Sequence, residues 1–143
     1  MSDQNKNIIR RVVDELWNRG RIELLNEIYH PDYSHIDPAN PLVTDLDGLR
    51  THVEVLRTSF PDMHVDIDEM IAEGDSVAKM WKMHGTFTAD FMGIPANDEP
   101  VSLSGITVYR MTGGKIKECV WGYDNLGLMQ QLGAFPAEAA ATP

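Results

Sequence analysis

Hydrophobic residues in the first part of the chain recur with the period of a helix. Residues 8–17 carry apolar side chains on one helical face, and Gly20 follows as a stop signal. A second, short helix is predicted over residues 22–29 and a third over about 47–59, each closed by a proline. Residues 32–45 are predicted to form a long irregular loop, with a short extended piece near its start.

From residue 64 onward the pattern changes to the two-residue alternation of half-buried strands. Four strands are predicted, followed by a short helix over residues 125–132. The strands cover residues 64–71, 77–87, 101–111 and 116–124. Helices first and antiparallel strands afterwards are typical of an α+β fold. Because strands of this length twist, we expect a cone-shaped, curved antiparallel sheet packed on about three N-terminal helices and enclosing a pocket.

The charge balance narrows the possible partners. The 143 residues include 12 basic and 22 acidic ones, a formal net charge of −10, and no basic stripe. A nucleic-acid-binding protein needs such a stripe to neutralise phosphates, and an anionic membrane surface attracts basic segments in the same way. We therefore expect neither nucleic acid nor a membrane as a partner.

The length predicts one domain over residues 1–143, with an ordered core over about 5–133 and a mobile tail over 134–143. The single cysteine, Cys119, excludes a disulfide within the chain and a thiolate metal cage. The sequence has no apolar run of 18 residues and no secretory signal pattern at its start, so the cytoplasm is the expected location.

Motifs spread over residues 5–133 occur together in one known family. They are WNRG at 17–20, HIDP at 35–38, FMGIP at 91–95, VSLSGI at 101–106 and WGYDNLGLMQQLG at 121–133. Together they resemble the SnoaL-like polyketide cyclase family, within the nuclear-transport-factor-2-like superfamily. The resemblance implies a homodimer with a deep apolar pocket and no metal or organic cofactor. It also implies acid/base chemistry, in which a proton α to a carbonyl is removed and an aldol-type reaction closes a ring of a polyketide ester.

Asp124 is the first catalytic candidate. It matches the family's acid/base carboxylate at the end of the last strand. A carboxylate facing an apolar cavity has a raised pKa, which suits proton transfer near neutral pH. The alternative is that Asp124 or Asn125 caps the helix that follows.

His35, in the proline-rich loop, is the second catalytic candidate. A histidine exchanges protons near neutral pH, and Asp37 is close enough in sequence to orient it. The alternative is a loop histidine with a structural hydrogen bond. Two or three ligands without a recognised spacing do not make a metal site, so none is predicted here.

Bulky residues on the predicted strands and the loop between them are candidates for the pocket wall. The two tryptophans either stack on a flat ligand or belong to the core. The face of the sheet that His84 occupies depends on strand register. Glu118 is six residues before Asp124, so on a regular strand both side chains face the same side. The candidates are Trp81, Met83, His84, Phe87, Phe91, Tyr109, Glu118 and Trp121.

Two departures from the family pattern bear on function. Phe87 stands where many relatives have a histidine after Gly-Thr, and the predicted strand 101–111 contains no histidine. The leading hypothesis is a cyclase or isomerase that acts on a hydrophobic carbonyl compound by general acid/base chemistry. The alternatives are a non-catalytic protein that binds a hydrophobic small molecule, and a dimeric interaction protein whose cavity is filled.

Overall fold

The computed structural model describes residues 2–134 and contains four α-helices and one π-helical segment within that range. The first helix runs directly into the π-helical segment, and Gly20 ends this unit with a positive φ of 70°. The helical elements are α1 (Ser2–Arg11), η1 (Val12–Trp17), α2 (Leu24–Ile28), α3 (Leu46–Ser59) and α4 (Asn125–Leu132).

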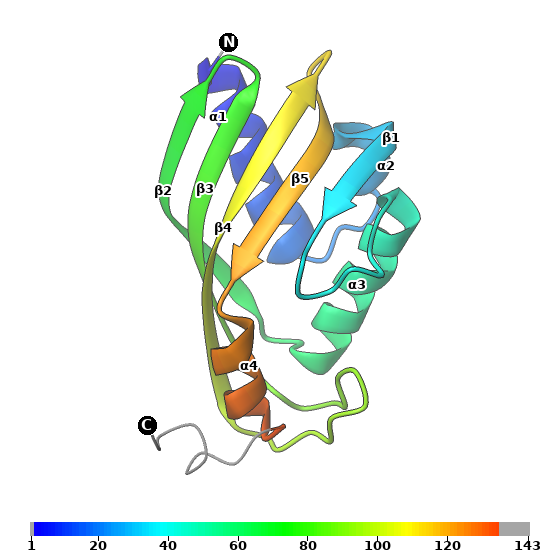
Figure 1. The fold of residues 1–143 in the computed structure, drawn as a ribbon, viewed down its shortest axis with the longest axis vertical. Helices are drawn as coiled ribbons and strands as arrows, with labels where there is room; N and C mark the ends of the chain where they lie inside the picture. The colour runs from blue at the N-terminus through cyan, green and yellow to red at the C-terminus, as the bar shows by residue number, and fades with distance from the viewer. Residues whose placement is uncertain (1, 135–143) are drawn as a thin grey trace.

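Five strands form one curved sheet in the order β1-β5-β4-β3-β2 (Figure 1). They are β1 (Tyr29–Ile36), β2 (His64–Glu73), β3 (Ser76–Thr86), β4 (Pro100–Thr112) and β5 (Lys115–Tyr123). Strands β2 to β5 form an antiparallel meander, and β1 pairs in parallel with β5. The helices α1 to α3 cover one face of the sheet, and α4 lies beyond the end of β5 (Figure 1). The predicted α+β class, with a curved sheet against N-terminal helices, is confirmed.

The proline-rich segment forms more regular structure than its sequence predicts. Strand β1 spans Tyr29–Ile36, where the sequence predicts only a short extended piece, and α2 ends at Ile28. Pro31 is tolerated because β1 is an edge strand whose register is irregular between Tyr29 and Ser34. The pairing with β5 depends on residues some 85 positions away in the chain, so local sequence patterns do not reveal it.

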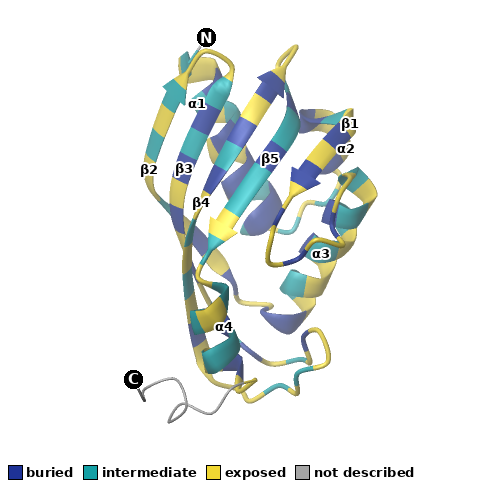
Figure 2. Cartoon of the chain, viewed as in Figure 1, coloured by how far each residue is buried: buried dark blue, intermediate teal, exposed yellow. Residues whose placement is uncertain are grey.

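Alternation along β3 separates the core from the outer face of the sheet (Figure 2). The inward residues Val77, Lys79, Trp81 and Met83 are buried, whereas the residues between them are less buried or exposed. Gly105 on β4 lies opposite Trp81, and a Cβ atom there would come within 2.6 Å of the indole ring. The backbone oxygen of Gly122 would be equally close, so a glycine is required at this position for Trp81 and β5 to pack as they do.

The description ends at Ala134, so the predicted mobile tail lies almost wholly outside the described residues and stays a prediction. Within residues 2–134, no helix combines the length and the apolar character that a membrane crossing requires.

Candidate functional site

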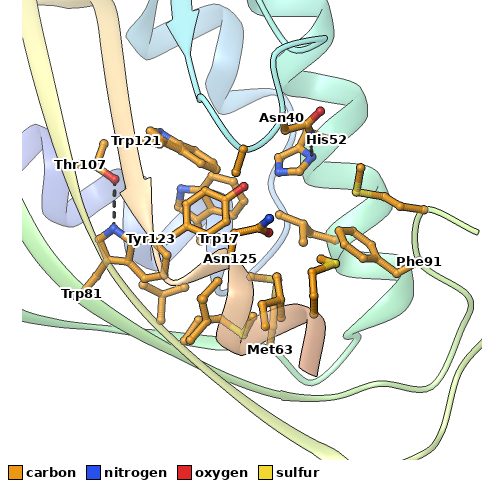
Figure 3. A pocket seen from close by; sticks show the side chains of 18 of the residues that line it. Trp17, Asn40, His52, Met63, Trp81, Phe91, Thr107, Trp121, Tyr123 and Asn125 are labelled. Carbon is orange, nitrogen blue, oxygen red and sulfur yellow. Dashed lines mark hydrogen bonds between the residues drawn. The ribbon is translucent and has the colours of Figure 1, made fainter. Parts of the chain in front are cut away.

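A cavity of about 250 Å³ lies on the inner face of the sheet, bordered by residues of α3, the β3–β4 connection and α4 (Figure 3). Its wall is mainly apolar and includes three tryptophans, one from η1, one from β3 and one from β5. A mostly apolar cavity with a few polar groups is the usual form of a small-molecule site. The main apolar side chains of the wall are Trp17, Met63, Trp81, Phe91, Trp121 and Met129.

The indole rings are held by contacts with one another and with the sheet. The ring centroids of Trp17 and Trp121 are 5.5 Å apart and tilted by 58°. Trp81 donates a hydrogen bond from Nε1 to Oγ1 of Thr107, at 3.0 Å. This bond satisfies the one polar atom of the Trp81 ring, so the face of the indole is available to a ligand.

His52, on α3, presents the only imidazole among the residues that line the cavity (Figure 3). One ring nitrogen, Nδ1, lies 3.5 Å from Nδ2 of Asn40, and the other faces the cavity (Figure 3). Burial lowers the pKa of His52, and the Asp37 carboxylate opposes this effect. The imidazole is therefore neutral at pH 7, with one nitrogen protonated and the other free to accept a proton.

Tyr123 and Asn125 add polar groups near the end of β5. The Tyr123 hydroxyl donates to Oδ2 of Asp37 at 3.0 Å, and Oδ1 of Asp37 accepts from the amide of Ala39 at 3.0 Å. Burial and the Asp37 charge both raise the pKa of Tyr123. The Asn125 side chain points into the middle of the cavity, where its amide can donate to a ligand oxygen (Figure 3).

Lys79, like His52, is a functional candidate that the sequence does not single out. It lines the cavity from the middle of β3 and is only 3 % exposed. Its Nζ lies 5.3 Å from the ring centroid of Tyr109 and 6.0 Å from that of Trp81. Burial lowers its pKa to about 8. The alternation of the strand predicts this position, because Lys79 lies two residues before Trp81 and four before Met83 and so shares their face of the sheet.

Sequence comparison shows the family to which this chain belongs. The sequence model of the SnoaL-like polyketide cyclases matches residues 7–132. The chain belongs to the SnoaL-like polyketide cyclase family. This membership supports a cyclase-type function for the cavity.

Individual relatives agree with the family assignment. Aklanonic acid methyl ester cyclase DnrD from Streptomyces peucetius is 27% identical over 131 residues, covering 88% of each chain. A protein proposed to be a polyketide cyclase from Acidithiobacillus ferrooxidans is 32% identical and superposes with a TM-score of 0.83, covering 94% of this chain and 97% of the other. A proposed SnoaL-like polyketide cyclase from Jannaschia sp. CCS1 is 25% identical with a TM-score of 0.85, covering 94% and 95%.

In this SnoaL-like chain, Asp124 lies outside the cavity wall. The residue is exposed, and its Oδ1 accepts a hydrogen bond from the backbone amide of Gly127 at 2.9 Å. Asp124 is therefore the N-cap of α4, the alternative that the sequence left open. Strand β5 ends at Tyr123, so the alternation that would have turned Asp124 to one face does not reach it.

His35 is buried next to the cavity but does not line it. Its Nδ1 is 2.7 Å from the Tyr33 hydroxyl, and its ring packs edge-on against Trp121 with a centroid distance of 4.7 Å. Nε2 is buried without a hydrogen-bond partner among the described residues. Burial lowers the pKa of His35 to about 4. Asp37, expected to orient His35, instead holds Tyr123.

Among the eight predicted pocket residues, Trp81, Met83, Phe91 and Trp121 line the cavity. The other four lie elsewhere. His84 is on the outer face, 3.3 Å from the Ser102 hydroxyl, and Glu118 forms an ion pair of 3.3 Å with Arg110 there. Phe87 stacks on Phe60 in the core, and Tyr109 lies beneath Lys79 as a buried core residue.

Metal-binding side chains do not gather in the described part of the chain. Within residues 2–134, no three His, Cys, Asp or Glu residues lie close enough together to hold a metal ion. The residues that line the cavity offer proton donors and acceptors, an amine and aromatic faces to a ligand.

Proposed function

We propose that the protein is a cyclase that binds a hydrophobic carbonyl compound in the cavity and closes a ring by general acid/base catalysis. The observation that carries this proposal is the neutral imidazole of His52, whose free edge faces a cavity walled by three indoles (Figure 3). A neutral imidazole has an unprotonated nitrogen that can accept a proton, as a general base requires.

The chemistry needs two proton transfers. A proton α to the carbonyl is removed to give an enolate, the enolate carbon attacks a second carbonyl of the same molecule, and the resulting alkoxide is protonated. Rotation of the Asn40 amide by 180° exchanges its donor and acceptor ends, and so favours either tautomer of His52. With the acceptor end of the amide toward Nδ1, Nε2 is unprotonated and accepts the α-proton, and the imidazolium so formed returns that proton to the alkoxide. The Asn125 amide can donate to the enolate oxygen.

The proposed ligand is flat and largely apolar. The indoles of Trp17, Trp81 and Trp121 offer aromatic faces, which favour stacking on a fused or conjugated ring system. The relative from Streptomyces peucetius is named as an aklanonic acid methyl ester cyclase, which suggests this ester as a probe.

The outer face of the sheet supports a homodimer. Exposed apolar side chains lie there on three neighbouring strands, and Met80 and Ile106 are partners in the β3–β4 register. Met80 is 41% exposed, Ile106 is 49% exposed, and Ile71 on β2 is 60% exposed. An apolar patch on an open sheet face is a typical surface for burial against a second copy.

The proposal is tested with aklanonic acid methyl ester as the probe substrate. Ring closure by aldol addition conserves the atoms, so the product is an isomer of unchanged mass that chromatography separates. We expect the wild-type protein to form this isomer, and His52→Gln to slow its formation by a factor of about 10² to 10⁴. Asp124→Asn is the matched control and should retain the wild-type rate. No isomer above the protein-free control would contradict the proposal.

A binding protein without turnover is the second candidate function. It is favoured by the position of Asp124, because the carboxylate that the family resemblance implied as catalytic caps α4 instead. This candidate predicts that the probe quenches tryptophan fluorescence to saturation while its chromatographic profile stays unchanged. Saturation together with isomer formation would exclude it.

A further inference from the structure

Lys79 occupies an unusual place for a lysine. It lies in the centre of the inward-facing row of β3 and is 3 % exposed. Across the sheet its register partner is Thr107, and the partner of Thr107 is Trp121. Lys79, Thr107 and Trp121 thus form one cross-strand row, and all three line the cavity.

No carboxylate compensates this lysine within residues 2–134. Seven ion pairs are present there, and none includes Lys79. Nζ of Lys79 lies over the aromatic rings of Tyr109 and Trp81, and the Cys119 thiol is near enough to interact with it electrostatically. Burial raises the pKa of Cys119 to about 12 and also raises the pKa of Tyr109, so both groups are neutral.

An ammonium group in such surroundings is destabilised relative to the free amine. Contacts with the aromatic faces offset only part of the free energy of hydration that the charge loses on burial. The pKa of about 8 means that a substantial fraction of Lys79 is unprotonated near pH 8. An unprotonated, desolvated lysine amine is a nucleophile toward carbonyl carbon. A methionine or leucine would fill the same volume without this penalty, so the packing of the core does not explain the lysine.

We propose that Nζ of Lys79 forms a covalent imine with aldehydes or ketones that enter the cavity. The nitrogen lone pair forms a bond to the carbonyl carbon, and a proton moves from nitrogen to oxygen to give a carbinolamine. Loss of water then gives the imine, and the reverse reaction restores both partners. From the protonated imine, loss of an α-proton gives an enamine, which is a carbon nucleophile. The inference rests on the proposed function only in requiring that the cavity admit carbonyl compounds.

The test uses 2-naphthaldehyde as the probe and sodium cyanoborohydride as the trap. Hydride and a proton reduce the imine to a stable secondary amine, so the protein gains the aldehyde, loses one water and gains two hydrogens. Intact-mass analysis should show an adduct at pH 7.5, and peptide mapping should place lysine labelling on Lys79, with any labelling of the α-amino group counted separately. The other four lysines of the chain, Lys6, Lys82, Lys115 and Lys117, should react at least tenfold more slowly.

Two variants complete the test. Lys79→Met should lose the adduct, and Lys82→Met should keep it, because Lys82 lies on the outer face of the same strand, 3.6 Å from Asp68. Peptide mapping of the wild-type protein decides the question even where Lys79→Met does not fold. Labelling spread evenly over the lysines would overturn the inference. So would saturable quenching of tryptophan fluorescence by 2-naphthaldehyde without an adduct on Lys79, or the absence of both quenching and adduct.

The outcomes also separate this inference from the proposed function. An adduct on Lys79 without ring closure of aklanonic acid methyl ester supports the imine and contradicts the cyclase. Ring closure without an adduct on Lys79 supports the cyclase and contradicts the imine. Ring closure that is lost in His52→Gln, together with an adduct that the same variant retains, supports both.

Discussion

The Asp124 carboxylate accepts a hydrogen bond from the backbone amide of Gly127 at 2.9 Å. This bond satisfies one of the amides at the start of α4 that have no partner within the helix. The neighbouring Asn125 is turned toward the cavity by the same junction (Figure 3). The two adjacent residues after β5 therefore have different roles: Asp124 caps the helix, and Asn125 faces the cavity.

Substitution of Asp124 should affect stability more than chemistry. We expect Asp124→Ala to lower the free energy of unfolding by about 1 kcal/mol, and Asp124→Asn to leave it nearly unchanged, because Asn is an equally good N-cap. Urea denaturation followed by circular dichroism measures both. A catalytic Asp124 would show the reverse, with turnover lost in Asp124→Asn at unchanged stability.

The buried amine of Lys79 should make stability depend on pH in the alkaline range. Its pKa is lowered from 10.5 to about 8 on folding, so between these values the unfolded chain binds more protons than the folded one. The contribution of Lys79 to the free energy of unfolding should therefore rise from pH 8 to pH 10.5, and its penalty should be fully present below pH 8. Cys119 acts in the opposite direction above pH 9, because burial raises its pKa from 9.0 to about 12. The size of the rise is on the order of 3 kcal/mol.

Lys79→Met is the matched control for this pH effect. Cys119 and the buried tyrosines Tyr29 and Tyr109 oppose the Lys79 effect equally in both proteins, so the comparison isolates Lys79. In urea denaturation, the free energy of unfolding of wild type relative to the variant should increase from pH 7.5 to pH 10. The variant should also be more stable than wild type at pH 7.5, because it removes a buried charge without a counterion. Equal pH profiles for the two proteins would mean that the Lys79 ammonium is solvated or paired in solution.

His35 should titrate far below an ordinary histidine. Burial lowers its pKa from 6.5 to about 4, so the folded state binds fewer protons than the unfolded state between these values. Stability should therefore be lost as the pH falls from 6.5 toward 4. The imidazole proton signals of His35 in NMR report the titration directly. A midpoint for His35 near 6.5 would contradict its burial against Trp121.

The proposed dimer has its own test. Ile106 lies on the outer face of β4 and is 49% exposed, so a charge at this position should not disturb the core. We expect multi-angle light scattering to give twice the mass of one chain for the wild-type protein and a single-chain mass for Ile106→Lys. Thr112, at the exposed end of the same strand, provides the control substitution Thr112→Lys. A monomeric wild-type protein would remove the dimer proposal.

Much of the fold follows from local patterns in the sequence. The alternation along residues 77–87 predicts β3, and the same alternation places Trp81 and Met83 on the inner face. The helix over α3 follows from the periodicity that ends at Pro61. Strand β1 could not be predicted in this way, because its partner β5 is distant in sequence and Pro31 disfavours a strand.

The candidate site was harder to predict because it depends on strand ends and on register. Parity with Asp124 predicts Glu118 in the pocket, but Asp124 lies beyond the end of β5, and Glu118 faces outward. His84 has the opposite parity from Trp81 and is exposed. Lys79 has the correct parity but was overlooked, since a lysine in a strand is ordinarily a solvent-facing residue.

The most direct test of the cavity as a site of carbonyl chemistry is exchange of the α-hydrogens of 1-tetralone in D₂O, followed by NMR. Removal of an α-proton is the step assigned to His52, and exchange reports it without requiring the natural substrate. We predict that the wild-type protein accelerates the exchange, that Asp124→Asn retains the acceleration, and that His52→Gln loses most of it. Exchange no faster than in buffer while 1-tetralone saturates the tryptophan fluorescence, or exchange that depends on Asp124 and not on His52, would contradict this assignment.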